Sequence, residues 1–493
     1  MSRIKWLNLT LSLMMILVLL AGCGEAEPEI IKETVVVEKV VKETVTETII
    51  VEGTPEVIEK EVEKIVEVTA VPEHTDPVTL VYWSDPRFTQ VKGKEDLTQE
   101  PGDYERLLAE EFMAMHPNVT IEVEALKWED LTTKVTAAIA AGSPPNVLKD
   151  YLGRSSGYAW QGLLEPLEDA IPQEELDDYY PDLISQYTID GHLHGLPLFY
   201  WITHMTGNKA LWEEAGALDL LPLDDGEWTF EEFEAAINAI KTGDDVWPYG
   251  LQVASEQGDY HYLGPIWGMG ADLYAEGDYS QVVLNSPEGV AALEKIVQWV
   301  DEELIEPGAT TITGEEMGNI WMKGQMGVWG GGLATKNEVY RAEQEGRIDP
   351  DVKIDLFFAM YPHAADVKTG GMAAGPTGAV VFKQDDPDVR YWSIEFARFL
   401  ADPDNQREYC INSSQFPSRK SVGTPLAGDP DYERLLGWVD EWGLKNLGLA
   451  SPNYYEVRVE LFPRLQQAML GEKTAQEALD DYAEKANAIL SGD

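Results

Sequence analysis

Apolar positions in the body of the chain switch regularly between the spacing of strands and the spacing of helices. Val78–Trp83, Val119–Val123 and Asn146–Leu152 are short apolar runs of the kind that form strands. Tyr104–Met115 and Trp128–Ala141 instead carry apolar residues at helical intervals. Strands that alternate with helices predict a parallel sheet that helices cover on both faces.

Helix start signals recur towards the end of the chain. Thr229 with Glu232 forms the capping box of a helix that we expect over Phe230–Lys241. Thr474 with Glu477 forms a second capping box, which predicts a last helix that ends near Leu490. The body is therefore predicted to be a helix-rich α/β structure.

The first 23 residues have the pattern of an export signal. Arg3 and Lys5 precede an apolar run, Leu11–Ala21, which is too short to span a bilayer comfortably. The string that ends at Cys23, Leu-Ala-Gly-Cys, resembles a bacterial lipoprotein signal, in which Cys23 becomes the lipid-bearing amino terminus. The alternatives are an uncleaved anchor and an ordinary signal in which Cys23 is incidental. The only other cysteine is Cys410, so we expect no structural disulfide if Cys23 is lipidated.

The segment 24–76 differs in kind from the body. It consists mainly of Glu, Lys, Val, Ile and Thr, has no aromatic residue and contains a near-repeat, Val37–Thr44 against Val62–Thr69. Such a composition cannot build a core of its own, so we predict an acidic, flexible tether. Val37, Val41 and Val45 recur at near-helical spacing, which leaves a short coiled-coil stalk as the alternative.

Acidic residues outnumber Lys and Arg by 88 to 36, for a net charge of −52, and most of this charge lies in the body. A field of that sign repels nucleic acid and anionic lipid surfaces, so we expect no nucleic-acid partner. The plainer interpretation is an acidic surface that promotes solubility. Attraction of a cationic solute is the sharper alternative.

Several motifs, in their order along the chain, resemble one known family. The string GSPPNVLKDYLGRSSGYAWQGLLEPL spans Gly142–Leu167, GLPLFYWITHMTGNKALWEEAG spans Gly195–Gly216, and MKGQMGVWGGG spans Met322–Gly332. Together with the ending ALDDYAEKANAIL, they resemble the extracellular solute-binding proteins of family 1, the sugar-binding receptors of ABC importers. Asn146 stands where that family usually has Asp.

The resemblance implies that the body is an α/β structure of two Rossmann-like lobes with a hinged cleft between them. This is the type II fold of periplasmic binding proteins. By that pattern the first lobe comprises 77–196 and 374–417, and the second comprises 197–373 and 418–493. The solute lies in the cleft, and the partners are that solute and the permease subunits of an ABC transporter. We expect the receptor to be a monomer that needs no cofactor.

Aromatic platforms and polar groups at the carboxyl ends of strands are the candidates for solute binding, because sugars combine apolar C–H faces with many hydroxyls. The alternative for each Trp is a packed core side chain, and Arg154 can equally form a salt bridge with Asp150. By position and by resemblance, the predicted ligand-binding residues are Trp83, Asp85, Asp150, Arg154, Trp201, Trp267 and Trp329.

Two patterns in the chain resemble those of enzymes or metal sites. Gly153–Gly157 satisfies G-x-S-x-G, so a secreted serine hydrolase with a nucleophile elbow at Ser155 is the alternative function. His192 and His194, with His204 nearby, have a spacing that can suit a metal, although the residues around them favour a turn and a surface role. We predict no catalytic residue and no metal site. The predicted function is that of a lipid-anchored extracytoplasmic receptor that binds an oligosaccharide or a related sugar in the interlobe cleft and delivers it to a membrane permease.

Overall fold

The computed structural model of the chain describes residues 36–51, 54–69, 74–241, 245–275, 278–306 and 308–492. They divide into two units, one that ends at Thr75 and one that begins at Asp76. The predicted signal segment, including Cys23, lies outside the described residues.

The first unit contains two antiparallel strands, β1 (Val36–Val51) and β2 (Thr54–Thr69), which pair from Val36 with Thr69 to Val51 with Thr54. This differs from both alternatives that the sequence suggested for the segment, an irregular tether and a helical coiled-coil stalk. The signal that favours strands is the density of β-branched Val, Ile and Thr residues, which fit a pleated surface better than a helix.

A six-stranded mixed sheet forms the core of the first lobe, in the order β16-β8-β15-β5-β3-β4. The parallel pairing predicted for the first strands is confirmed, because β3 runs parallel to both β4 and β5. β15 returns from far along the chain and pairs antiparallel with β5 and β8. The strands are β3 (Val78–Ser84), β4 (Val119–Ala125), β5 (Val147–Tyr151), β8 (Leu196–Ile202), β15 (Ala374–Val381) and β16 (Phe416–Pro417).

A four-stranded sheet forms the core of the second lobe, in the order β10-β13-β9-β14. In this sheet β13 is parallel to β10 and antiparallel to β9. The strands are β9 (His204–Asn208), β10 (Trp247–Gly250), β13 (Met326–Gly331) and β14 (Leu356–Ala359). Short antiparallel pairs lie outside the two sheets: β6 (Thr188–Ile189) with β7 (His192–Leu193), and β11 (Tyr274–Ala275) with β12 (Asp278–Val282).

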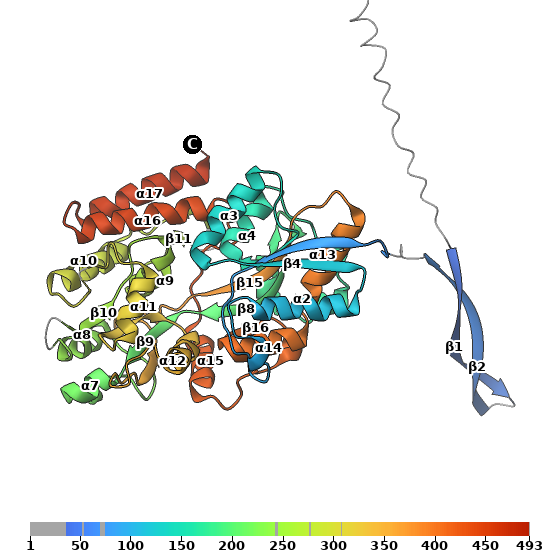
Figure 1. Ribbon diagram of the computed structural model, residues 1–493, viewed down its shortest axis with the longest axis horizontal. Coiled ribbons are helices and arrows are strands. Elements are labelled where there is room, and N and C mark those ends of the chain that lie inside the picture. The colour runs from blue at the N-terminus through green and yellow to red at the C-terminus, as the bar shows by residue number, and fades with distance from the viewer. Residues whose placement is uncertain are drawn as a thin grey trace, which may run out of the picture. The chain divides into compact units, whose positions relative to one another are not determined.

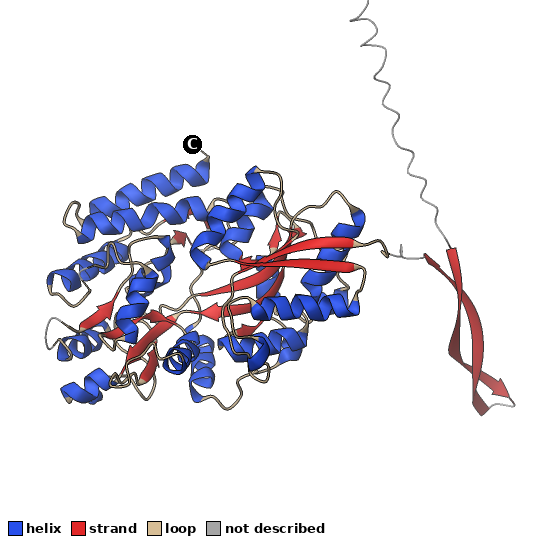
Figure 2. Ribbon diagram, viewed as in Figure 1, coloured by secondary structure: helices blue, strands red, loops and turns tan. Residues whose placement is uncertain are grey.

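Helices flank both sheets (Figure 2). The capping boxes at Thr229 and Thr474 are both present, each with its Glu three residues on. The longer helices are α2 (Asp103–Met115), α3 (Trp128–Ala140), α4 (Leu152–Trp160), α8 (Phe230–Ala239), α9 (Asp259–Gly268), α10 (Pro287–Asp301), α11 (Gly314–Met322), α12 (Ala334–Gln344), α13 (Pro387–Leu400), α14 (Pro403–Ser413), α15 (Pro430–Trp442), α16 (Tyr454–Met469) and α17 (Ala475–Ser491). Shorter ones are α5 (Gln173–Leu176), α6 (Pro181–Gln186) and α7 (Ala210–Ala215).

Three chain segments cross between the lobes side by side. β8 of the first sheet becomes β9 of the second with only Thr203 between them, and the chain returns at Ala373, just before β15. Thr203 and Ala373 are hydrogen-bonded to each other, and Ala373 also bridges to Lys445 on the third crossing. The first sheet therefore extends to Ile202, six residues beyond the boundary predicted after Leu196.

The last two helices pack on the second lobe. α16 and α17 lie antiparallel to each other above α10 (Figure 1) and contact it. The body is thus a two-lobed type II fold, and the crossing segments form the floor between the two sheets.

Candidate functional site

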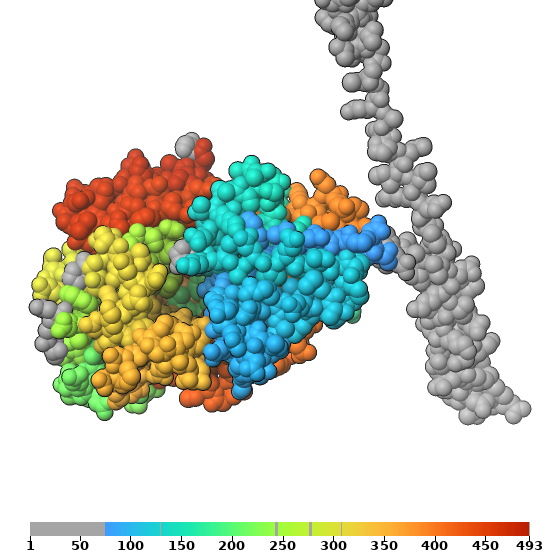
Figure 3. All heavy atoms as spheres, viewed as in Figure 1, coloured from blue at the N-terminus to red at the C-terminus, as the bar shows by residue number. Residues whose placement is uncertain are grey.

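A cavity of about 340 Å³ opens between the two lobes, directly above the crossing segments. Its size falls in the range of small-molecule pockets. In Figure 3 the blue and cyan surface of the first lobe meets the yellow and amber surface of the second. Both lobes contribute aromatic side chains to the cavity wall. They are Trp128, Tyr151, Phe199, Trp201, Tyr409 and Phe416 from the first lobe, and Tyr260, Trp329 and Tyr454 from the second.

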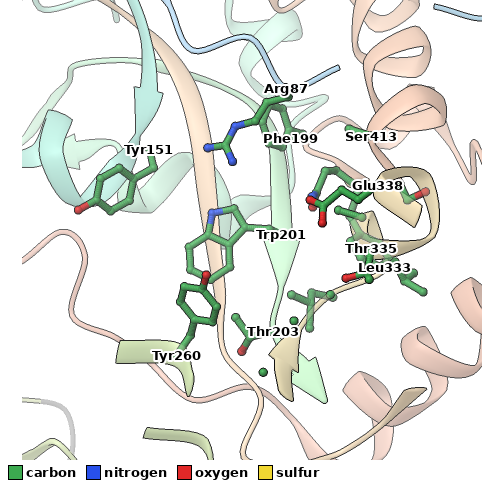
Figure 4. A pocket seen from close by; sticks show the side chains of 18 of the residues that line it. Arg87, Tyr151, Phe199, Trp201, Thr203, Tyr260, Leu333, Thr335, Glu338 and Ser413 are labelled. Atoms are coloured by element: carbon green, nitrogen blue, oxygen red, sulfur yellow. The ribbon is translucent and has the colours of Figure 1, made fainter. Parts of the chain in front are cut away.

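Trp201 and Tyr260 are both part of this wall (Figure 4). Trp201 projects from β8, and its ring lies across Gly375 of the neighbouring strand. A Cβ atom at Gly375 would come 2.3 Å from Cζ2 of Trp201, so only glycine leaves room for this ring position. The position of the Trp201 indole thus depends on a glycine in the neighbouring strand.

Trp329 is held from behind by other rings. It projects from β13 and stacks on Trp321 with a centroid distance of 5.7 Å, while the imidazole of His261 lies 5.7 Å away on another side. Complete burial lowers the pKa of His261 to about 3, so its imidazole is neutral at physiological pH. Trp329 is therefore a rigid apolar surface backed by uncharged groups.

Charged groups line the cavity as well. Nε of Arg458 donates to Oδ2 of Asp259 at 2.7 Å, and its Nη1 donates to the Tyr151 hydroxyl at 2.9 Å. Arg87 forms an ion pair with Asp85, and its guanidinium lies 4.6 Å above the ring of Trp128. Burial raises the pKa of Tyr151 to about 12, so its hydroxyl stays protonated.

Direct hydrogen bonds join the lobes on both sides of the cavity. On one side Nε1 of Trp128 donates to Gln257 at 3.0 Å. On the other, Nδ2 of Asn337 on α12 donates to the carbonyl of Asn412 and to Oγ of Ser414, both at 2.9 Å. The lobes therefore lie closed over the cavity.

The predicted site residues fall into two groups. Trp201 and Trp329 line the cavity. Trp267 does not, since it lies in α9 with 1% of its surface exposed and packs in the core. Trp83 is also buried, and Asp85 reaches the site only through its pairing with Arg87.

Asp150 and Arg154 pair with each other instead of facing the cavity. Nη2 of Arg154 donates to Oδ1 of Asp150 at 2.6 Å, and its Nε donates to Oδ2 at 2.9 Å. The guanidinium lies 4.0 Å from the ring of Trp128, so the pair supports the wall from behind. This is the salt bridge that the sequence left open as the alternative. It forms because α4 begins at Leu152, directly after β5, which places Arg154 in the first turn of that helix.

Sequence reasoning missed several lining residues. Arg87 follows Asp85 at the end of β3, so its position at a strand end was a usable signal. Tyr260, Glu338 and Arg341 line the cavity from α9 and α12. Nothing in the local pattern of those helices distinguishes these side chains from ordinary surface residues.

The enzyme-like patterns do not form active-site geometry. The hydroxyl of Ser155 is buried inside α4 and donates to the backbone carbonyls of Tyr151 and Leu152 at 3.2 and 3.3 Å. A nucleophile elbow would instead expose this hydroxyl at a sharp turn. His192 is exposed and pairs with Glu168. Within the described part of the chain, no cluster of three or more His, Cys, Asp or Glu side chains could hold a metal ion.

No helix among residues 36–492, in the ranges described above, is long and apolar enough to cross a membrane.

The family described as bacterial extracellular solute-binding protein matches residues 108–435. The diacetylchitobiose-binding protein DasA of Streptomyces coelicolor is 25% identical over 342 residues, which cover 68% of this chain and 74% of DasA. An ABC transporter solute-binding protein of Thermotoga lettingae, solved with α-D-tagatose, has a TM-score of 0.69 at 22% identity and covers 84% of this chain and 99% of its own. Maltose-bound MalE3 of T. maritima has a TM-score of 0.67 at 20% identity and covers 84% of this chain and 100% of its own.

Proposed function

The chain belongs to the bacterial extracellular solute-binding proteins, and we propose that it is a lipid-anchored receptor that binds a sugar and delivers it to an ABC importer. Membership of this family implies a location outside the cytoplasm. The observation that carries the sugar assignment is the convergence of Trp201, Tyr260 and Trp329 from two lobes on one cavity.

Flat aromatic rings and hydrogen-bonding side chains are what a sugar requires, because its ring has apolar C–H faces and a polar rim. Asn337, Gln257 and Arg87 supply amide and guanidinium groups around the aromatic platforms. The relatives point the same way, since their names or ligands are diacetylchitobiose, tagatose and maltose. An oligosaccharide or a related sugar is therefore the proposed solute.

The proposed mechanism is opening and closing of the lobes around the solute. The crossings at Thr203, Ala373 and Lys445 are the narrow connections about which the lobes would rotate. The closed form would be the one that the permease subunits receive. Binding and release, without covalent chemistry, would be the whole activity.

The amino terminus would attach the protein to the membrane. Lipid on Cys23 would hold the protein at the membrane surface, and the segment 24–76 would separate the body from that surface. Because one cavity lies within one chain, a monomer is sufficient for binding. Mass spectrometry of the membrane-extracted protein tests the anchor, since it should detect a lipid-modified Cys23 and lose it in Cys23→Ser.

A thermal-shift screen of the purified protein with mono- and oligosaccharides, polyols, polyamines and metal ions tests the sugar assignment. We expect one sugar to raise the melting temperature in a saturable way, as any ligand that binds only the folded state does. Trp201→Ala should abolish this shift. Tyr340→Ala is the matched control, because Tyr340 is 61% exposed and does not line the cavity.

A melting temperature that rises with polyamines or metal but with no sugar would contradict the carbohydrate assignment. Hydrolysis of a sugar or an ester that is lost in Ser155→Ala would instead favour the hydrolase alternative.

A further inference from the structure

Five of the side chains that line the cavity carry a charge: Arg87, Asp259, Glu338, Arg341 and Arg458. They differ in whether another protein group already binds them. Four of them are hydrogen-bonded or ion-paired to other protein groups. Glu338 has no hydrogen-bond or ion-pair partner anywhere in the described part of the chain.

Each of the three guanidinium groups already donates to at least one protein acceptor. Arg458 is paired with Asp259, and Arg87 is paired with Asp85. Arg341 donates to backbone carbonyls, from Nε to Asn337 at 3.3 Å and from Nη2 to Arg87 at 3.4 Å. An arriving anion would therefore share each of these cations with an existing protein acceptor.

The side chain of Glu338 is exposed, and it lines the cavity. It projects from α12, the helix that also carries Thr335, and lines the same cavity as Arg87 (Figure 4). Desolvation by the surrounding walls raises the pKa of its carboxyl above the ordinary value, and Arg341, Arg87 and Arg347 offset only part of this rise. This carboxyl therefore loses some of its hydrogen bonds to water. Within the described part of the chain, no protein donor replaces them.

We propose that Glu338 determines solute specificity by accepting hydrogen bonds from neighbouring donor groups of a neutral or amino sugar, and that it excludes sugar acids. This inference rests on the proposed function. An ionised carboxylate only accepts hydrogen bonds and can accept two or more of them at once. Adjacent hydroxyls, or a hydroxyl and an ammonium group, match it, whereas the carboxylate of a sugar acid is repelled.

The test measures binding by calorimetry with glucose, glucosamine and glucuronate, and with neutral, amino and acidic disaccharides. The full-length protein should bind a neutral or amino sugar and bind the matching acid at least tenfold more weakly. Glu338→Gln keeps the side-chain shape but removes the charge. It should weaken binding of the neutral or amino sugar about ten- to hundredfold, the usual size of a hydrogen bond to a charged group.

The same substitution should bring the acidic sugar at least tenfold closer to its neutral counterpart, because the repulsive element is lost. Glu343→Gln is the matched control, since Glu343 is exposed on the same helix but does not line the cavity. It should leave every affinity unchanged.

The outcomes separate this inference from the receptor assignment. If Trp201→Ala abolishes sugar binding but Glu338→Gln leaves it unchanged, the receptor assignment stands and the role of Glu338 is refuted. A wild-type preference for the acidic sugar refutes it too. If the wild-type protein binds no sugar at all, the proposed function and this inference both fail.

Discussion

Thr203 and Ala373 form hydrogen bonds with each other at the point where two chain segments cross between the lobes. The backbone N–H of Thr203 donates to the carbonyl of Ala373 at 2.8 Å, and the N–H of Ala373 donates to Oγ1 of Thr203 at 3.0 Å. Both residues are buried. One side-chain hydroxyl therefore satisfies a backbone donor at the junction of the two lobes.

Thr203→Val should destabilise the protein by about 1–3 kcal/mol, because it leaves the buried N–H of Ala373 without an acceptor. Urea unfolding measures this change. Thr203→Ser, which keeps the hydroxyl, should recover most of it. Thr377→Val is a second control, since Oγ1 of Thr377 is buried without a hydrogen bond in the described part of the chain and its loss should cost little.

Asn337→Ala should shift the lobes towards an open arrangement. The substitution removes the two hydrogen bonds that α12 makes to Asn412 and Ser414 of the first lobe. Small-angle X-ray scattering should show a larger radius of gyration without solute, and the solute affinity should fall. Asn238→Ala removes a hydrogen bond within one helix, to Glu234, and should change neither quantity. An unchanged radius for both variants would mean that these bonds do not set closure.

Gly375→Ala should impair solute binding through Trp201. The added methyl group would overlap the indole and push it from its position across the strand. We expect at least a tenfold loss of sugar affinity by calorimetry. Gly157→Ala is the control, because a Cβ at Gly157 meets no atom within 4 Å. Sugar affinity equal to that of the wild type would show that the ring position is not needed.

Asp150→Asn should destabilise the protein by about 3–5 kcal/mol, because it leaves the guanidinium of Arg154 buried with a neutral partner. Both side chains are almost completely buried. Arg154→Met should have a comparable cost. In a double-mutant cycle the combined variant should cost clearly less than the sum of the two single changes, and additive costs would argue against the pairing.

Buried His204 should make the protein less stable in mild acid. Burial lowers its pKa from 6.5 to about 4. Between these values the unfolded chain binds the proton and the folded chain does not, so this contribution to the free energy of unfolding is present above pH 6.5 and is lost as the pH falls towards 4.

His204→Gln should therefore flatten the pH dependence of urea unfolding between pH 6.5 and 4 by up to about 1.4 kcal/mol per pH unit. His192 is the contrasting control. Its hydrogen bond to Glu168 raises its pKa, so His192→Gln should not flatten the curve. Identical slopes for wild type and His204→Gln would contradict the prediction.

Much of the fold was predictable because its signals are local. The strand at Val78, the helix that follows it and the capping boxes at Thr229 and Thr474 depend on residues within a few positions of one another. The β-branched segments at 36–69 carried an equally local signal, but their charge and lack of aromatics favoured a tether over strands.

The sequence by itself therefore determined the α/β class, the order of the first strands and helices, and two of the aromatic residues that line the cavity, Trp201 and Trp329. Tertiary structure alone decided that Arg154 forms an ion pair with Asp150 and that Trp267 lies in the core. It also brought Glu338 of the second lobe and Arg87 of the first lobe to one cavity (Figure 4). The physical reason is that hydrophobic periodicity reports which face of an element is buried, whereas a binding site depends on which distant side chains meet when the two sheets face each other.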